Sequence, residues 1–181
     1  MNKQVMPSTS IALLVGGRSQ RMGSNKLLKR ISGKTLLRTT FETACAIGLP
    51  VQLIRRDIIE HCGPLSGVIT AFRNTTSLNI LFLAGDMPWV TETYLRQLVS
   101  FGILGAPVFS FNDSQVGFPF VLQRAQLEVV EDQIERNQRS LQRLFLNLNA
   151  CVLLRPRDVE RQLMNVNTPH DLNGALKDNG T

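Results

Sequence analysis

Short continuous apolar runs alternate along the chain with longer stretches in which apolar residues recur every three or four positions. The short runs predict buried strands, because each spans only a few residues and ends at glycine or at polar residues. We expect such strands at 10–15, 49–54, 78–86, 106–111 and 150–155, with another extended piece at 118–123 after a turn at 112–117.

The periodic stretches predict amphipathic helices that pack against these strands. Leu65, Val68, Ile69 and Phe72 follow the spacing i, i+3, i+4, i+7 behind Pro64, which suits the first position of a helix. Other helices are expected at 34–47 with Gly48 as the terminating residue, after a Thr91 cap, at 127–134, at 141–148 and after Thr168, and the tail 177–181 should fray. Strands that alternate with helices predict an α/β fold, with a mostly parallel sheet and helices on both faces.

Length and composition indicate the number of domains and the cellular environment of the protein. A chain of 181 residues with 43% hydrophobic content is expected to form one domain, 1–181, with a sizeable core. No apolar run approaches the roughly 20 residues that cross a bilayer, so no membrane association is expected. The three scattered cysteines, Cys45, Cys62 and Cys151, form no CxxC clip or disulfide framework, which favours a reducing cytoplasm.

The net charge of +6 is unevenly distributed, since eight basic residues and no acidic residue precede Glu42. A nucleic-acid-binding module would spread its basic residues over a groove-sized face and interleave aromatics, whereas Phe41 is the only aromatic near this cluster. No nucleic-acid partner is therefore expected. Two interpretations stay open: a solvated basic face, or a site for a compact polyanion such as a triphosphate.

A basic, glycine-containing loop follows the first strand, within the sequence LLVGGRSQRMGSNKLL at 13–28. Gly16 and Gly17 allow backbone N–H groups to approach an anion, and Arg21 and Lys26 add cationic donors. The loop matches neither GxxxxGK[ST] nor GxGxxG. It predicts a triphosphate site of a different type.

Asp86 follows the strand expected at 78–86. Ligands bind beyond the carboxyl ends of the strands in such sheets, so Asp86 and Gly16–Gly17 should face one crevice. We expect the Asp86 carboxylate at the mouth of that crevice, where water reaches it. Mg²⁺ takes carboxylates together with phosphate oxygens, so Asp86 is a candidate metal ligand; alternatively, it caps the turn before Thr91.

Four motifs together resemble the molybdenum cofactor guanylyltransferase family of nucleotidyltransferases. They are the glycine-rich signature at 14–26, GPLSGV at 63–68, LAGDMPWV at 83–90 and NVNTPHDL at 165–172. The first motif is shared by many sugar-nucleotide and cytidylyl transferases, whereas its combination with GPLSG and NVNTP is narrower. NVNTP can also serve simply as a turn and a helix start.

The resemblance implies a Rossmann-like, three-layer nucleotidyltransferase fold. It also implies transfer of GMP from GTP to molybdopterin, with Mg²⁺ as cofactor and pyrophosphate as the second product. A nucleotide-binding half would cover about 10–100 and an acceptor-binding half about 101–177. Other cofactor-assembly proteins and molybdoenzymes would be candidate partners.

The resemblance also implies roles for particular residues. The GTP-binding residues would be Leu14, Val15, Gly16, Gly17, Lys26, Asp57 and Asp86. Asn165 and Asn167 would lie on the molybdopterin side, and Asp86 would hold the metal. Arg21, Lys26 and Asp86 form the expected catalytic set, because nucleotidyl transfer mainly needs aligned substrates and neutralised phosphate charge.

Three departures from the family pattern keep alternatives open. Asn25, before Lys26, resembles the related cytidylyltransferases, whereas the double glycine favours guanine. A nucleotidyltransferase that uses CTP or a sugar phosphate acceptor is therefore one alternative. A catalytically lapsed assembly partner is another alternative, suggested by Asn25, by the short 49–62 segment and by Phe118, where the family usually has His.

Overall fold

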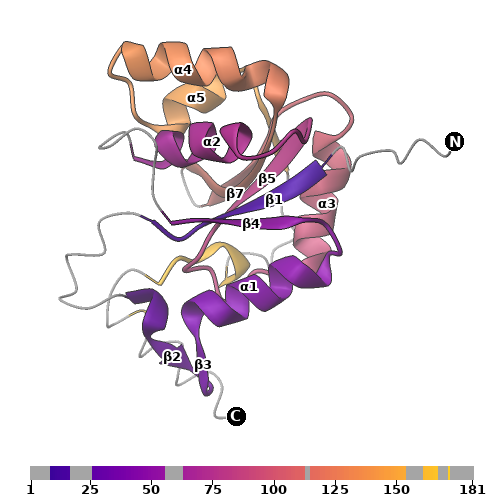
Figure 1. The fold of residues 1–181 in the computed structure, drawn as a ribbon, viewed down its shortest axis with the longest axis vertical. Coiled ribbons are helices and arrows are strands. Elements are labelled where there is room, and N and C mark those ends of the chain that lie inside the picture. The colour runs from indigo at the N-terminus through magenta and orange to yellow at the C-terminus, as the bar shows by residue number, and fades with distance from the viewer. Residues whose placement is uncertain are drawn as a thin grey trace, which may run out of the picture.

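The computed structural model of the chain is a six-stranded sheet between two layers of helices (Figure 1). The structure describes residues 9–16, 26–55, 63–112, 115–153, 161–166 and 171. The strand order is β4-β1-β5-β7-β6-β8, and β7 alone among these six runs antiparallel to its neighbours. The expected three-layer α/β fold with a mostly parallel sheet is confirmed.

The strands of this sheet agree with the apolar runs in the sequence. Ile11, Ala12 and Leu13 have no exposed surface, as expected for a strand covered on both faces. The strands are β1 (Thr9–Leu14), β4 (Val51–Ile54), β5 (Asn79–Ala84), β6 (Val108–Asn112), β7 (Gln115–Gln123) and β8 (Cys151–Leu153).

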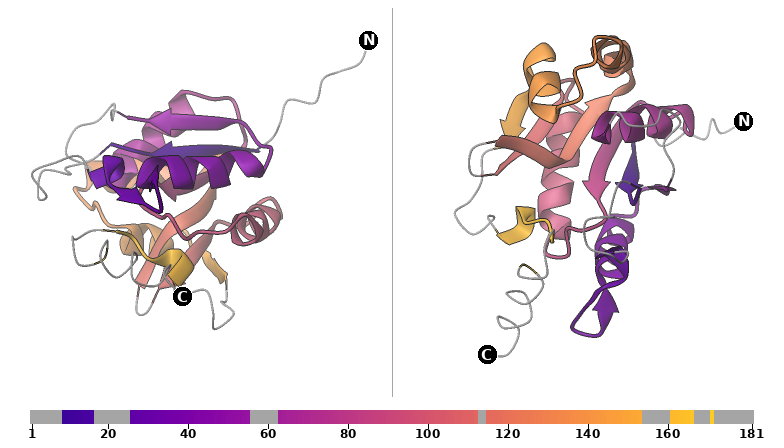
Figure 2. Two further views of the ribbon diagram at one scale, coloured as in Figure 1. Left: turned by 90° about the horizontal axis from the view of Figure 1, so that it is seen from below. Right: turned by 90° about the vertical axis from the view of Figure 1, so that its left-hand side faces the viewer.

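Helices cover both faces of the sheet and enclose two cores (Figures 1 and 2). One face carries α2 (Pro64–Arg73), α4 (Leu127–Glu135) and α5 (Leu141–Asn147). The other face carries α1 (Leu36–Ala46) and α3 (Glu92–Gly102). Under α2, the rings of Phe82 and Phe120 stack with centroids 5.0 Å apart, and Phe120 and Phe109 stack at 4.8 Å. Such aromatic pairs contribute specific packing beyond their buried area.

The helix ends use the capping residues that the sequence predicts. Thr91 accepts a hydrogen bond from the Tyr94 backbone N–H at 3.3 Å, and Pro64 is the first residue of α2. Gly48 follows α1 with φ +80°, a conformation that glycine adopts without strain. No helix of the described ranges is long and apolar enough to cross a membrane.

The expected boundaries of one helix and one turn are wrong. The helix expected at 34–47 begins only at Leu36, because 30–31 and 34–35 pair as a small hairpin, β2 (Arg30–Ile31) and β3 (Lys34–Thr35). The turn expected at 112–117 is shorter, since β7 begins at Gln115. The helix expected after Thr168 and the fraying tail lie outside the described residues, Asp171 excepted.

Candidate active site

The carboxyl ends of β1 and β5 lie side by side and form the edge that the sequence predicts. Leu14 is the register partner of Ala84, and the Gly85 N–H donates to the Leu14 carbonyl at 3.0 Å. On the other side, the N–H groups of Val15 and Gly16 both donate to the Ile54 carbonyl, at 2.9 and 3.1 Å. The segment 14–16 is thus fixed between the end of β4 and the Gly85–Asp86 turn.

Close backbone contacts explain the glycines of this edge. A Cβ atom on Gly16 would lie 2.9 Å from the Arg55 carbonyl oxygen, and one on Gly67 of α2 would lie 2.9 Å from Leu14 Cδ1. Gly63, in front of α2, has φ +61°. The GPLSG motif therefore starts α2 and lets its first turns approach the end of β1. The side chains of Leu14 and Val15 are partly buried against the two cores, and their role in GTP binding stays a prediction.

Lys26 and Asp86 form an ion pair at this edge. The Lys26 Nζ lies 2.5 Å from the Asp86 Oδ2, and the two side chains are only 19% and 10% exposed. Lys26 opens a short 3₁₀ turn, Lys26–Leu28, whose Leu27 is buried beneath the Gly85 turn. The structure therefore brings together two residues that the sequence predicts from separate motifs.

The expectation that water reaches the Asp86 carboxylate at the crevice mouth is wrong, since Asp86 is 7% exposed. Lys26 covers its side chain, and the Val166 N–H donates to its backbone carbonyl at 3.0 Å. Val166 is itself buried against Ile31 and Leu36. The residues that cover Asp86 come from segments distant in sequence. The position of Asp86 at a strand end therefore did not predict its burial.

Asn165 is the third predicted residue at this edge, next to the Val166 contact with Asp86. Its Oδ1 atom is buried and has no hydrogen-bond partner among the described residues. Buried polar atoms are normally paired, so this oxygen can accept a hydrogen bond from a ligand. The Val166 N–H bond attaches the segment 165–166 to the turn that carries Asp86. Whether NVNTP also starts a helix lies outside the described residues.

A divalent cation fits this edge only if substrate supplies most of its ligands. The described residues hold no group of three or more His, Cys, Asp or Glu side chains that could enclose a metal. Mg²⁺ is commonly held by one or two carboxylates together with substrate phosphates and water. The single Asp86 carboxylate suits that kind of site.

The basic cluster before Glu42 divides into two kinds of residue. Lys34 and Arg38 both bind Glu42 at the surface, at 2.6 and 2.8 Å. Hydrogen bonds from Lys34 and then Arg38 lower the pKa of the Glu42 carboxyl. These two residues form a solvated basic face, as one of the two open interpretations expects. Lys26 instead pairs with Asp86 at the edge of the sheet, and the polyanion site stays a prediction.

Several predicted residues cannot be located at this edge. Gly17, Arg21, Asn25, Asp57 and Asn167 lie outside the described residues, and their roles stay predictions. Phe118, one of the departures from the family pattern, is described: it packs against both cores with its ring 5.0 Å from Phe120. Sequence reasoning missed Leu27 and Val166 as parts of the site.

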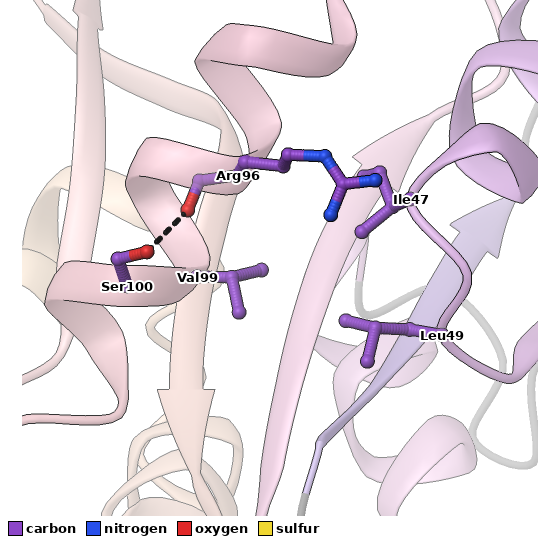
Figure 3. Close-up of a pocket in the computed structure, with 5 residues that line it drawn as sticks. All are labelled: Ile47, Leu49, Arg96, Val99 and Ser100. Atoms are coloured by element: carbon purple, nitrogen blue, oxygen red, sulfur yellow. Dashed lines mark hydrogen bonds between the residues drawn. The ribbon is translucent and has the colours of Figure 1, made fainter.

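A hollow of about 200 Å³ lies elsewhere, between the segment that joins α1 to β4 and the helix α3 (Figure 3). Leu49, one of its lining residues, precedes β4, so the hollow lies at the opposite end of the strands from Leu14–Gly16. Its one charged side chain, Arg96, binds Glu92 at 2.7 Å and the Ala46 carbonyl at 3.1 Å. None of the described residues that line the hollow carries a carboxylate, and the hollow is distinct from the candidate site.

Comparison with known proteins agrees with this geometry. The family model for the MobA-like NTP transferase domain matches residues 11–54 and 46–151, and the chain belongs to this family. It is accordingly a nucleotidyltransferase.

Similar curated proteins carry a narrower name. A probable molybdenum cofactor guanylyltransferase of Thermococcus gammatolerans is 30% identical, covering 89% of this chain and 95% of that protein. A protein of the same name from Aquifex aeolicus is 26% identical over 91% of this chain and 88% of its own length.

Among solved structures, molybdopterin-guanine dinucleotide biosynthesis protein A from Archaeoglobus fulgidus is similar with a TM-score of 0.74 and 21% identity, over 93% and 97% of the two chains. A 4-diphosphocytidyl-2C-methyl-D-erythritol synthase from Anaerococcus prevotii is similar with a TM-score of 0.73 at 10% identity, over 96% and 98%. The fold is therefore shared by proteins with different substrates.

Proposed function

We propose that this chain transfers GMP from GTP to molybdopterin in a Mg²⁺-dependent reaction, giving the guanine dinucleotide form of the cofactor and pyrophosphate. The observation that carries the proposal is the meeting of Lys26, Asp86 and the Asn165 segment at one edge of the sheet. The choice of GTP and molybdopterin rests on the four sequence motifs and on relatives named molybdenum cofactor guanylyltransferase.

The reaction needs little covalent help from side chains. A phosphate oxygen of the acceptor attacks the α-phosphorus of GTP, and the bond to the α–β bridging oxygen breaks as pyrophosphate leaves. The attacking group is already an anion, so no general base is required. Catalysis then consists of alignment of the two phosphates and neutralisation of their charge.

Each described residue has one task in this scheme. The Lys26 ammonium binds phosphate oxygens as a point charge, with Arg21 as the second predicted cation. The Gly16 backbone leaves room for close approach of the nucleotide. Asp86 is the residue that would hold Mg²⁺, and the ion, when bound, neutralises charge on the phosphates.

The acceptor side is assigned to the NVN segment. The Asn165 oxygen has no partner within the part of the chain that the structure describes, which supports a polar ligand there. Asn167 is assigned by its place in the motif. Asp57 is kept as a nucleotide-side residue because the family resemblance implies that role. Other cofactor-assembly proteins and molybdoenzymes are proposed as partners. A reducing compartment is also proposed, because Cys45 and Cys151 are free and exposed.

CTP is the main alternative substrate, because the fold is shared almost equally with a cytidylyl-type enzyme. The lapsed-enzyme alternative is weaker, since Phe118 is accounted for by packing and Lys26 and Asp86 are both in place.

Thermal melts with GTP and Mg²⁺ against CTP and Mg²⁺ at equal concentrations test the base. A ligand that binds the native state raises the melting temperature by mass action. We expect GTP to give the larger rise, and a larger rise with CTP would transfer the assignment to a cytidylyltransferase.

A further inference from the structure

We propose that Lys26 is a reversible latch on the Asp86 carboxylate, and that a polyphosphate must draw the ammonium away before this carboxylate takes a divalent cation. The inference rests on the proposed function only in taking a polyphosphate and a divalent cation as the ligands. It assigns Lys26 a second task beyond phosphate binding, namely control of the order in which ligands bind.

The first support is electrostatic. The Lys26 ammonium touches the Asp86 Oδ2 at 2.5 Å, and both side chains are largely shielded from water. A divalent cation on either oxygen of the same carboxylate would lie within a few ångströms of the ammonium. Repulsion between these like charges is weakly screened away from bulk water, so the ammonium and the cation compete for Asp86.

The second support is mechanical, because one partner is fixed and the other can turn. Asp86 follows directly on the Gly85 N–H bond to Leu14, and its own carbonyl accepts from Val166. The Lys26 backbone is held by the Lys29 N–H bond to its carbonyl at 3.0 Å, whereas its ammonium sits at the end of a flexible four-carbon stem. The flexible stem therefore allows the ammonium to turn from the carboxylate toward a phosphate.

The third support is the arrangement of charge along this segment. Between Lys26 and Arg38 the sequence carries basic residues and no acidic residue, and the Lys26 ammonium pairs with the Asp86 carboxylate, 60 residues away. A polyphosphate brings several negative charges and competes effectively for a lysine ammonium. Once the ammonium is transferred, the Asp86 carboxylate is left without its cation and becomes an attractive ligand for a divalent ion.

The latch predicts that a variant without the Lys26 ammonium gains affinity for a divalent cation. Lys26→Met keeps most of the stem and removes the ammonium, so Asp86 is left as an uncompensated carboxylate. We expect this variant to bind Mn²⁺ without any nucleotide at least about tenfold more tightly than the wild-type protein does, since one competing charge is gone. Mn²⁺ should also raise its melting temperature while leaving that of the wild type almost unchanged.

Two further variants of the full chain isolate the cause. Lys29→Met removes an exposed positive charge of the same segment and is the matched control for net charge. The double variant Lys26→Met/Asp86→Asn removes the carboxylate as well. We expect no gain in Mn²⁺ affinity in either protein. An equal gain in Lys29→Met, or a gain that survives in the double variant, would overturn the latch, as would a folded Lys26→Met protein with wild-type Mn²⁺ affinity.

Two additions keep the test decisive if Lys26→Met does not fold. Lys26→Gln removes the charge but can still donate a hydrogen bond to Asp86, and it should show the same gain. In the wild-type protein, inorganic tripolyphosphate should strengthen Mn²⁺ binding at least about tenfold after its own Mn²⁺ complex is subtracted. Equal affinity with and without tripolyphosphate would contradict the proposal. No nucleotide or pterin enters these measurements, so failure of GMP transfer and failure of the latch are separate results.

Discussion

Two ion pairs at opposite ends of the sheet have similar geometry and different surroundings. Lys26 and Asp86 meet at 2.5 Å with side chains 19% and 10% exposed, whereas Arg96 and Glu92 meet at 2.7 Å with 51% and 44% exposed. Exposed pairs contribute little to stability, and buried pairs lose much of their attraction to the cost of desolvation. The N–O distance is similar in the two pairs and does not distinguish them. The burial of the Lys26–Asp86 pair does distinguish it, and because burial brings little stability, it calls for a functional explanation.

The largest expected effect comes from Asp86→Asn. This change keeps the shape of the side chain but removes the negative charge that is proposed to hold Mg²⁺. Loss of one charge-stabilising group commonly costs about a hundredfold or more in rate, roughly 3 kcal/mol. Pyrophosphate release, measured alongside a thermal melt, checks the effect. Near-normal turnover in a folded variant would exclude the metal role and favour the alternative interpretation, in which Asp86 only caps a turn.

Lys26→Ala should affect both binding and stability. The sequence alone predicts weaker GTP binding with the fold intact. The ion pair adds a stability cost of about 3 kcal/mol, because removal of one partner leaves a nearly buried charge unpaired. GTP titration and urea unfolding measure the two effects, with Lys29→Ala as the exposed control, and unchanged affinity would remove the phosphate role.

Gly67→Ala should lower the stability of the fold moderately, because Gly67 of α2 contacts Leu14 next to the candidate site. The added Cβ would lie 2.9 Å from Leu14 Cδ1, so the Leu14 side chain must turn at the end of β1. Overpacking of this kind costs about 1–3 kcal/mol, with the lower end expected for the flexible end of a side chain. Gly117→Ala has no neighbour within 4 Å and is the matched control. Equal stability of the two variants would show that α2 does not need glycine here.

The smallest effect is expected from Arg96→Ala, the exposed counterpart. Its pair with Glu92 is a surface i,i+4 contact and should contribute less than about 1 kcal/mol. Turnover should not change, since Arg96 lies at the far end of the strands. If Arg96→Ala lost as much turnover as Lys26→Ala, the two ion pairs could not be distinguished as functional and structural.

The sequence predicted the elements that depend on local chemistry. Apolar runs located the buried strands, and Pro64, Thr91 and Gly48 marked helix ends, because capping involves neighbouring residues only. The rule for parallel strands also placed Gly16 and Asp86 at one edge. The hairpin β2–β3 was missed because strands of two residues are too short to show periodicity, although Ser32 and Gly33 with positive φ form its turn.

The features that the sequence did not predict depend on contacts between distant segments. The Lys26–Asp86 pair joins residues 60 positions apart, and no local pattern selects that partner for Lys26. The burial of Asp86 depends on Val166, which lies still further along the chain. Even so, the sequence alone identified Lys26, Asp86 and Asn165 as candidate site residues, because each lies in a motif that resembles the family pattern. The division into a nucleotide half and an acceptor half stays a prediction.

Pyrophosphate release by the wild-type chain, with molybdopterin as acceptor and Mg²⁺ present, tests the central claim most directly. GTP and CTP are supplied separately at equal concentration, and a reaction without molybdopterin measures hydrolysis. The proposed function predicts release that requires molybdopterin and is faster with GTP than with CTP. Faster release with CTP, or release that does not depend on molybdopterin, would contradict it.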